Sequence, residues 1–152
     1  MNRRDLILGG AAVALTASTA QASDHAGHDM AGHDMHAMEA NKYAALIKSA
    51  ADCQVTGDAC VAHCLTAIQG GDTTLAACLR SVTEMQALCA ATMKLAALDA
   101  ASAPKLIALC AEVCEACEKE CRKHEKHHAT CKACAESCAT CVKECKKALK
   151  AA

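Results

Sequence analysis

Fourteen cysteines lie between residues 53 and 145 of this 152-residue chain, and most follow the spacing of one helix face. The most regular runs advance in alternating steps of four and three residues, as core positions do in a helix bundle. These runs are Cys110, Cys114, Cys117 and Cys121, then Cys131, Cys134, Cys138, Cys141 and Cys145. Before them come Cys53, Cys60 and Cys64, and then Cys78 and Cys89. Met85 and Met93 continue the second line and are possible accessory metal ligands. The spacing predicts a column of thiols along one shared axis.

Three interpretations compete for these thiols. Inert packing is disfavoured because cysteine is a small side chain, and nine cysteines within residues 110–145 would leave a core short of volume. Disulfides along one helix are disfavoured because residues three or four apart hold their Cβ atoms about 5–6 Å apart. A disulfide needs about 3.5–4.5 Å. Disulfides between cysteines of different helices remain possible. The alternative function is therefore that of a helical interaction protein stabilised by disulfides or by structural zinc.

Metal binding suits the spacing best, because an ion placed between two sulfurs bridges a separation that a disulfide cannot. Zinc and iron–sulfur sites each need four ligands in a compact set. Soft thiolates also select Cu(I), and about one Cu(I) per thiolate leaves the core nearly neutral, which avoids burying unpaired charge. We therefore expect many Cu(I) ions per chain, held by all fourteen cysteines.

Helices must position these cysteines. From Asn41 onward the chain is rich in good helix formers, and it is interrupted at Gly70-Gly71-Asp72, at 99–104 around the only proline, and at 127–130. These breaks define helices at about 41–69, 73–98, 104–127 and 130–150. Short connections make neighbouring helices antiparallel. The predicted fold class is all-α, an up-down-up-down four-helix bundle with a cysteine-lined core, occupying residues 41–152.

The composition supports this interior and limits the function. Tyr43 is the only aromatic residue, so the usual bulky core side chains are missing and metal ions would help to fill the space. A formal net charge of -1 argues against nucleic acid or an anionic membrane as partner. The cysteine pairs lie inside longer runs without a strand pattern, unlike a thioredoxin-like redox motif. We see no catalytic constellation and expect no enzyme.

Residues 1–22 have the pattern of a signal peptide. Arg3-Arg4 precede an apolar segment that ends at Ala20-Gln21-Ala22, a small-residue cleavage site. The arginine pair is typical of a twin-arginine signal, although a general secretory signal remains the alternative. The apolar segment is too short to span a membrane, so the mature chain should carry no membrane span. The sequence therefore predicts a periplasmic or otherwise exported protein, cleaved near Ala22.

Residues 23–40 form a Met/His-rich segment without apolar periodicity, which predicts a flexible tail. Imidazole and thioether groups are both copper ligands. The candidate accessory ligands here are His25, His28, Met30, His33, Met35, His36 and Met38. A low-complexity linker is the alternative interpretation.

Several motifs together resemble a known family. They are Cys60-Val61-Ala62-His63-Cys64, Val113-Cys114-Glu115-Ala116-Cys117 and Cys138-Ala139-Thr140-Cys141. As a set, with the arginine pair and the Met/His segment, they resemble the exported copper storage proteins of bacteria, the Csp1-type group. The resemblance implies a four-helix bundle that assembles as a homotetramer and stores Cu(I) for exported copper enzymes.

The resemblance also implies that His63 lines one mouth of the bundle, where we expect it to be a metal ligand. The methionines that relatives carry after this histidine are absent here. His124, His127 and His128 are expected at the same end, because the first and third helices both finish there. His124 continues the cysteine stripe after Cys121 and is the favoured accessory ligand. His127 and His128 have two interpretations that both remain open: solvated residues in a turn, or metal ligands at the mouth.

Overall fold

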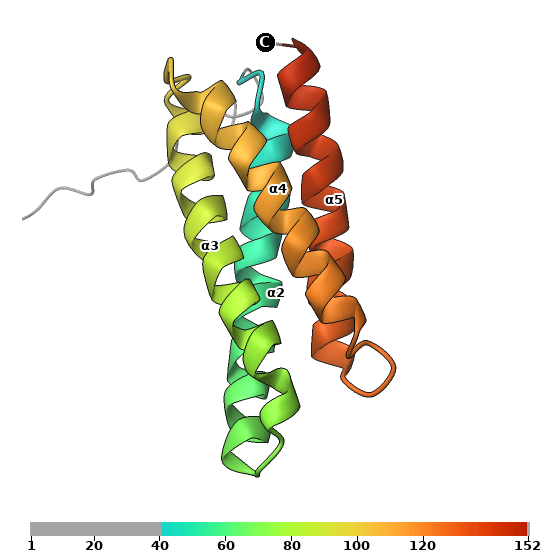
Figure 1. Ribbon diagram of the computed structural model, residues 1–152. Helices are drawn as coiled ribbons and strands as arrows, with labels where there is room; N and C mark the ends of the chain where they lie inside the picture. Colours follow the sequence, from blue (N-terminus) through green and yellow to red (C-terminus); the bar gives the residue numbers. More distant parts are fainter. Residues whose placement is uncertain (1–40, 152) are drawn as a thin grey trace, which may run out of the picture. The chain divides into compact units, whose positions relative to one another are not determined.

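The computed structural model describes residues 41–151, and helices dominate this part of the chain (Figure 1). The long helices are α2 (Ala44–Gln69), α3 (Ala76–Ala97), α4 (Ala103–Arg122) and α5 (Ala129–Ala151), and the short 3-10 helix η1 (Thr73–Leu75) leads into α3. This confirms the all-α class. The predicted signal peptide, 1–22, and the predicted Met/His-rich tail, 23–40, lie outside the described residues.

Each helix packs against the next one along the chain, and α5 returns to pack against α2, so the four helices enclose a single core (Figure 1). The connections are short, so neighbouring helices run antiparallel, as the up-down-up-down prediction required. Within residues 41–151, every helix falls short of the length and apolar character that crossing a bilayer demands.

The core changes character along the bundle axis. The start of α2, the end of α3, the start of α4 and the end of α5 share one end, because neighbours are antiparallel. Apolar side chains fill that end: Tyr43, Leu46, Ile47, Ala50, Ala96, Ala103, Ile107 and Ala148. Cysteines line the rest of the core, with Leu75, Val82, Met85 and Val142 between helices. Hydrophobic burial thus concentrates at the end away from the predicted histidine mouth.

A close approach between α2 and α3 fixes the positions of their cysteines along the bundle axis. A Cβ atom on Gly57 would lie 2.9 Å from the side chain of Gln86, so glycine leaves room for that side chain. The Gln86 amide donates to Asp58 Oδ1 at 2.7 Å, and Gln54 Nε2 donates to the backbone oxygen of Gln86 at 2.7 Å. These contacts hold the two helices in one register.

The turn between α2 and α3 falls where the sequence predicted it. Gly71 has φ +98°, a conformation that favours glycine, and its N–H donates to the Ile68 carbonyl at 3.0 Å. Asp72 Oδ1 accepts from the backbone N–H of Thr74 at 3.1 Å. The carboxylate therefore caps η1, and this turn lies at the end of the bundle where α4 also finishes.

The predicted end of the third helix is wrong, because the helix is shorter than expected. It was expected to run to about residue 127, but α4 ends at Arg122 and residues 123–127 form turns. The His124 N–H donates to Cys121 O at 3.0 Å, and the His127 and His128 N–H groups both donate to His124 O, at 3.1 and 3.0 Å. Neither Gly nor Pro marks this reversal. The chain turns because α5 must pack on α2 and α4, which overrides helix propensity.

Candidate metal centre

All fourteen cysteines are free thiols with no exposed surface. They come from all four long helices, and every one faces the common core. The predicted column of thiols is therefore confirmed as a structural feature. The periodicity explains why, since each step of three or four residues returns to the same helix face.

The sulfur atoms gather in five overlapping groups, and in each group all Sγ atoms lie within 4.8 Å of one another. We call Cys60, Cys64, Cys78 and Cys131 the outer tetrad, and Cys53, Cys89, Cys114 and Cys141 the inner tetrad. The three triads are Cys60, Cys121 and Cys134; Cys117, Cys134 and Cys138; and Cys110, Cys141 and Cys145. Every cysteine belongs to a group, and Cys60, Cys134 and Cys141 each belong to two.

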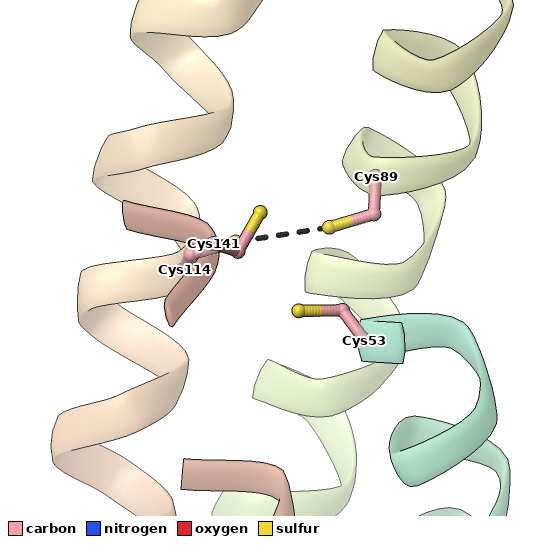
Figure 2. Close-up of side chains that lie close together, drawn as sticks. All are labelled: Cys53, Cys89, Cys114 and Cys141. Carbon is pink, nitrogen blue, oxygen red and sulfur yellow. Dashed lines mark hydrogen bonds between the residues drawn. The ribbon is translucent and has the colours of Figure 1, made fainter. Parts of the chain in front are cut away.

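The inner tetrad takes one cysteine from each long helix. Figure 2 shows the four side chains pointing toward one another from separate helices, with Cys89 Sγ and Cys114 Sγ 3.7 Å apart. Ser137 Oγ donates a hydrogen bond to Cys53 Sγ at 3.1 Å, and Cys89 Sγ donates to Met85 Sδ at 3.6 Å. Met85 therefore sits beside the thiols, as its position on the stripe predicted. Ser137 was missed, although it lies three and four residues from two predicted ligands.

The distances between sulfurs favour shared ions over disulfides. Neighbours across helices include Cys78 and Cys121 at 3.6 Å and Cys89 and Cys110 at 3.8 Å. Cys117 and Cys121, one turn apart on α4, are at 4.0 Å. A disulfide bond is about 2.05 Å long. Two sulfurs that each bond one metal at about 2.3 Å can lie up to about 4.6 Å apart, so the column suits metal without large movement.

Burial controls the protonation of the thiols in the absence of metal. Loss of solvation raises the pKa of Cys64 to about 11 and the pKa of Cys131 to about 12. The hydrogen bond with Cys121 has the opposite effect on Cys78 and lowers its pKa to about 2. The Cys64 and Cys131 thiols therefore hold their protons at neutral pH. A metal ion must displace these protons when it binds.

Histidines gather at the end of the bundle nearest the outer tetrad. His63 Nε2 and His128 Nδ1 are 2.8 Å apart, and the His124 and His128 rings are 6.3 Å apart. His124 Nε2 is buried and has no hydrogen-bond partner among the described residues. His63 and His124 thus share one end, as predicted. Of the two histidines left open, His128 contacts His63, whereas His127 is exposed. We call His63, His124 and His128 the histidine mouth.

The other predicted accessory ligands divide into two sets. Met93 is partly buried and packs against the core. The candidates in the Met/His segment, His25, His28, Met30, His33, Met35, His36 and Met38, lie outside the described residues. Their role stays a prediction.

Comparison with known proteins identifies a single family. A family profile described as "Copper storage protein" matches residues 38–150. The "Uncharacterized cysteine-rich protein YhjQ" of Bacillus subtilis is 35% identical over 84 residues, which cover 55% of this chain and 76% of that protein.

Solved structures agree with this match. The Cu(I)-bound copper storage protein Csp3 of B. subtilis is similar with a TM-score of 0.63 and 34% identity, covering 70% of this chain and 96% of that one. A cytosolic copper storage protein from Streptomyces lividans, solved with five coppers, gives a TM-score of 0.67 and 28% identity, covering 76% and 96%. The S. lividans protein Ccsp, loaded with 10 copper equivalents, gives 0.66 and 29%, covering 80% and 90%.

The prediction of a periplasmic or exported location is wrong on this comparison. The similar structures include a protein described as cytosolic, which points away from export. The export prediction rested on residues 1–22, which lie outside the described part. The comparison supports the resemblance at the level of the family and not of the exported Csp1-type group.

The raised thiol pKa values predict how the metal-free protein responds to alkali. A thiol whose pKa rises on folding keeps its proton after the unfolded chain has lost it. Its stabilising effect is therefore complete below about pH 9 and is lost as pH rises toward 11 or 12. We expect the free energy of unfolding to fall over this interval, by up to about 1.4 kcal/mol per pH unit for each such thiol.

Urea unfolding of reduced, metal-free protein between pH 8 and about 11 measures this effect. The matched variant Cys64→Ser removes one titrating thiol and should show a shallower decline than the wild type. Equal slopes for the two proteins would contradict the assignment of a raised pKa to Cys64.

Proposed function

The chain belongs to the copper storage protein family, and from this membership we propose that it stores many Cu(I) ions on the thiolates of its cysteine column. The observation that carries the proposal is the burial of all fourteen free thiols in overlapping groups within one core. The similar proteins solved with Cu(I), with five coppers and with 10 copper equivalents support it.

Charge explains why Cu(I) suits a continuous column. The core contains no buried cation among the described residues, whose buried polar side chains are Ser49 and Thr92. Thiolates at this depth therefore need positive charge from the cargo. One Cu(I) for each thiolate balances the charge along the whole column, whatever its length. Sulfur ligands, which Cu(I) prefers over oxygen ligands, are the main donors that the core offers.

We propose that copper enters through the histidine mouth. The outer tetrad follows directly, since Cys64 is the next residue after His63. From there the triads and the inner tetrad continue the column by ligand exchange between neighbouring sulfurs. The opposite end is closed by apolar side chains, among them Leu46 and Ile107, which offer no ligand. The column therefore fills and empties from one end.

Storage is favoured over catalysis because the thiols surround their cargo on all sides. A catalytic metal keeps an open position for substrate, whereas all fourteen cysteine side chains are fully buried. The homotetramer implied by the resemblance stays a prediction. The exposed apolar residues Val55, Leu98 and Leu109 are positions at which substitutions can test such an assembly.

Copper uptake tests the function directly. We expect anaerobic, reduced protein to take up about ten or more Cu(I) ions per chain in the presence of a competing chelator, because overlapping thiolate groups share ions. Titration followed by a chromophoric Cu(I) chelator measures the number. Saturation at two or three ions, or stronger binding of Zn(II) than of Cu(I), would favour a structural zinc protein instead.

The histidine mouth can be tested through the rate of uptake. We expect His63→Ala to slow Cu(I) loading several-fold and leave the final number of ions nearly unchanged, because His63 lies before the column and not within it. Stopped-flow absorbance of the growing Cu(I)–thiolate band measures the rate. His127→Ala removes an exposed histidine from the same turn and should load at the wild-type rate. Equal rates for both variants would argue against entry at this end.

A further inference from the structure

The outer tetrad is arranged as a tetrahedral site for a divalent ion. Its sulfurs are separated by 4.0 Å between Cys60 and Cys78, 3.8 Å between Cys60 and Cys131, and 3.9 Å between Cys78 and Cys131. A zinc ion with four thiolates at about 2.3 Å has sulfurs about 3.8 Å apart. These three sulfurs therefore already form one face of such a tetrahedron. Cys64 Sγ, within 4.8 Å of all three, supplies the fourth corner.

The location of the outer tetrad reduces the cost of a divalent site. A zinc ion with four thiolates carries a net charge of about −2, which is expensive in an apolar core. The outer tetrad lies at the histidine end of the bundle, because Cys64 directly follows His63, and an imidazole N–H is a donor that thiolate sulfur can accept. His124 Nε2 is buried at this end, makes no hydrogen bond among the described residues and lies 3.8 Å from Glu120 Oε1.

The inner tetrad takes one residue from each long helix and lies beyond the two triads that share Cys134, away from the histidine mouth. Its neighbours are the Ser137 hydroxyl, which donates to Cys53 Sγ, and the Met85 thioether. Both groups are neutral, whereas an imidazole near the outer tetrad can also carry positive charge. The two tetrads therefore have similar ligands, and the outer one is nearer to groups that can offset a net charge of −2.

We propose that the outer tetrad also binds one Zn(II) ion per chain when copper is scarce, closing the entrance of the column until Cu(I) displaces it. This inference rests on the proposed function, because the same thiolates lie first on the copper path. On binding, the four residues become thiolates and release to solvent the protons that they still hold, and the site with Zn(II) bound carries a net charge of −2. When four Cu(I) ions replace the Zn(II) ion on these thiolates, the site becomes neutral and Zn(II) leaves as the free ion.

Cobalt(II) reports such a site, because four thiolates around Co(II) give a visible tetrahedral spectrum. The experiment titrates Co(II), then Zn(II), into the reduced, metal-free full chain. We expect one Co(II) per chain with the tetrahedral thiolate spectrum, and its loss on addition of one equivalent of Zn(II). Cys64→Ser should lose the spectrum and bind Zn(II) at least about tenfold more weakly, since even supporting contacts to a metal ligand are worth that much.

Cys89→Ser is the matched control, since it makes the same change in the inner tetrad and should keep the spectrum. Circular dichroism of each variant checks that the helices are intact. A wild-type protein without the tetrahedral spectrum would overturn the proposal, and so would a Cys64→Ser protein that keeps it unchanged.

Copper uptake by the same three samples separates this inference from the proposed function. If the wild type takes up Cu(I) in large number but shows no tetrahedral Co(II) spectrum, the zinc site fails and storage stands. If none of the three proteins takes up Cu(I) beyond two or three ions, the proposed function fails whatever the Co(II) result.

Discussion

Buried thiolates need positive charge close by, and this requirement shapes the whole structure. Water cannot reach the fourteen sulfurs, so burial favours the protonated thiol until a metal ion replaces the proton, and Cys78, hydrogen-bonded to Cys121, is an exception. The raised pKa values of Cys64 and Cys131 reflect the preference of buried thiols for the proton. Separations of 3.6–4.0 Å between neighbouring sulfurs suit the metal-bound form. Protons and Cu(I) carry the same charge, so the core can exchange one for the other without a change in net charge.

One end of the bundle supplies most of the apolar packing, and the rest of the core holds the metal-binding thiols. Apolar side chains such as Leu46 and Ile107 close one end and supply the hydrophobic burial that a core made of cysteine provides poorly. Toward the other end, thiols in contact with one another line the core, and His63, His124 and His128 lie at the mouth. On the proposed path copper enters and leaves at this end, which makes the outer tetrad the place where the protein would discriminate between ions.

Periodicity predicted most of the fold and the cysteine site, because steps of three and four residues fix which face of a helix turns inward. It placed all fourteen cysteines in the core and Met85 beside them. It could not predict the end of α4, because residues 123–127 carry no Gly or Pro and the reversal is imposed by packing of α5. It also missed the contact of His128 with His63 and that of Ser137 with Cys53, since each joins segments far apart in the sequence. The export prediction used the pattern of residues 1–22 and the resemblance to the exported group, and the similar structure described as cytosolic contradicts it.

X-ray absorption at the copper edge of the fully loaded protein tests the central claim most directly. The account predicts that each Cu(I) ion has two or three sulfur ligands, with further copper ions close by, because neighbouring groups in the column share Cys60, Cys134 and Cys141. Copper bound mainly by nitrogen or oxygen, or isolated ions without copper neighbours, would contradict the claim that the buried sulfurs act as one continuous binding column.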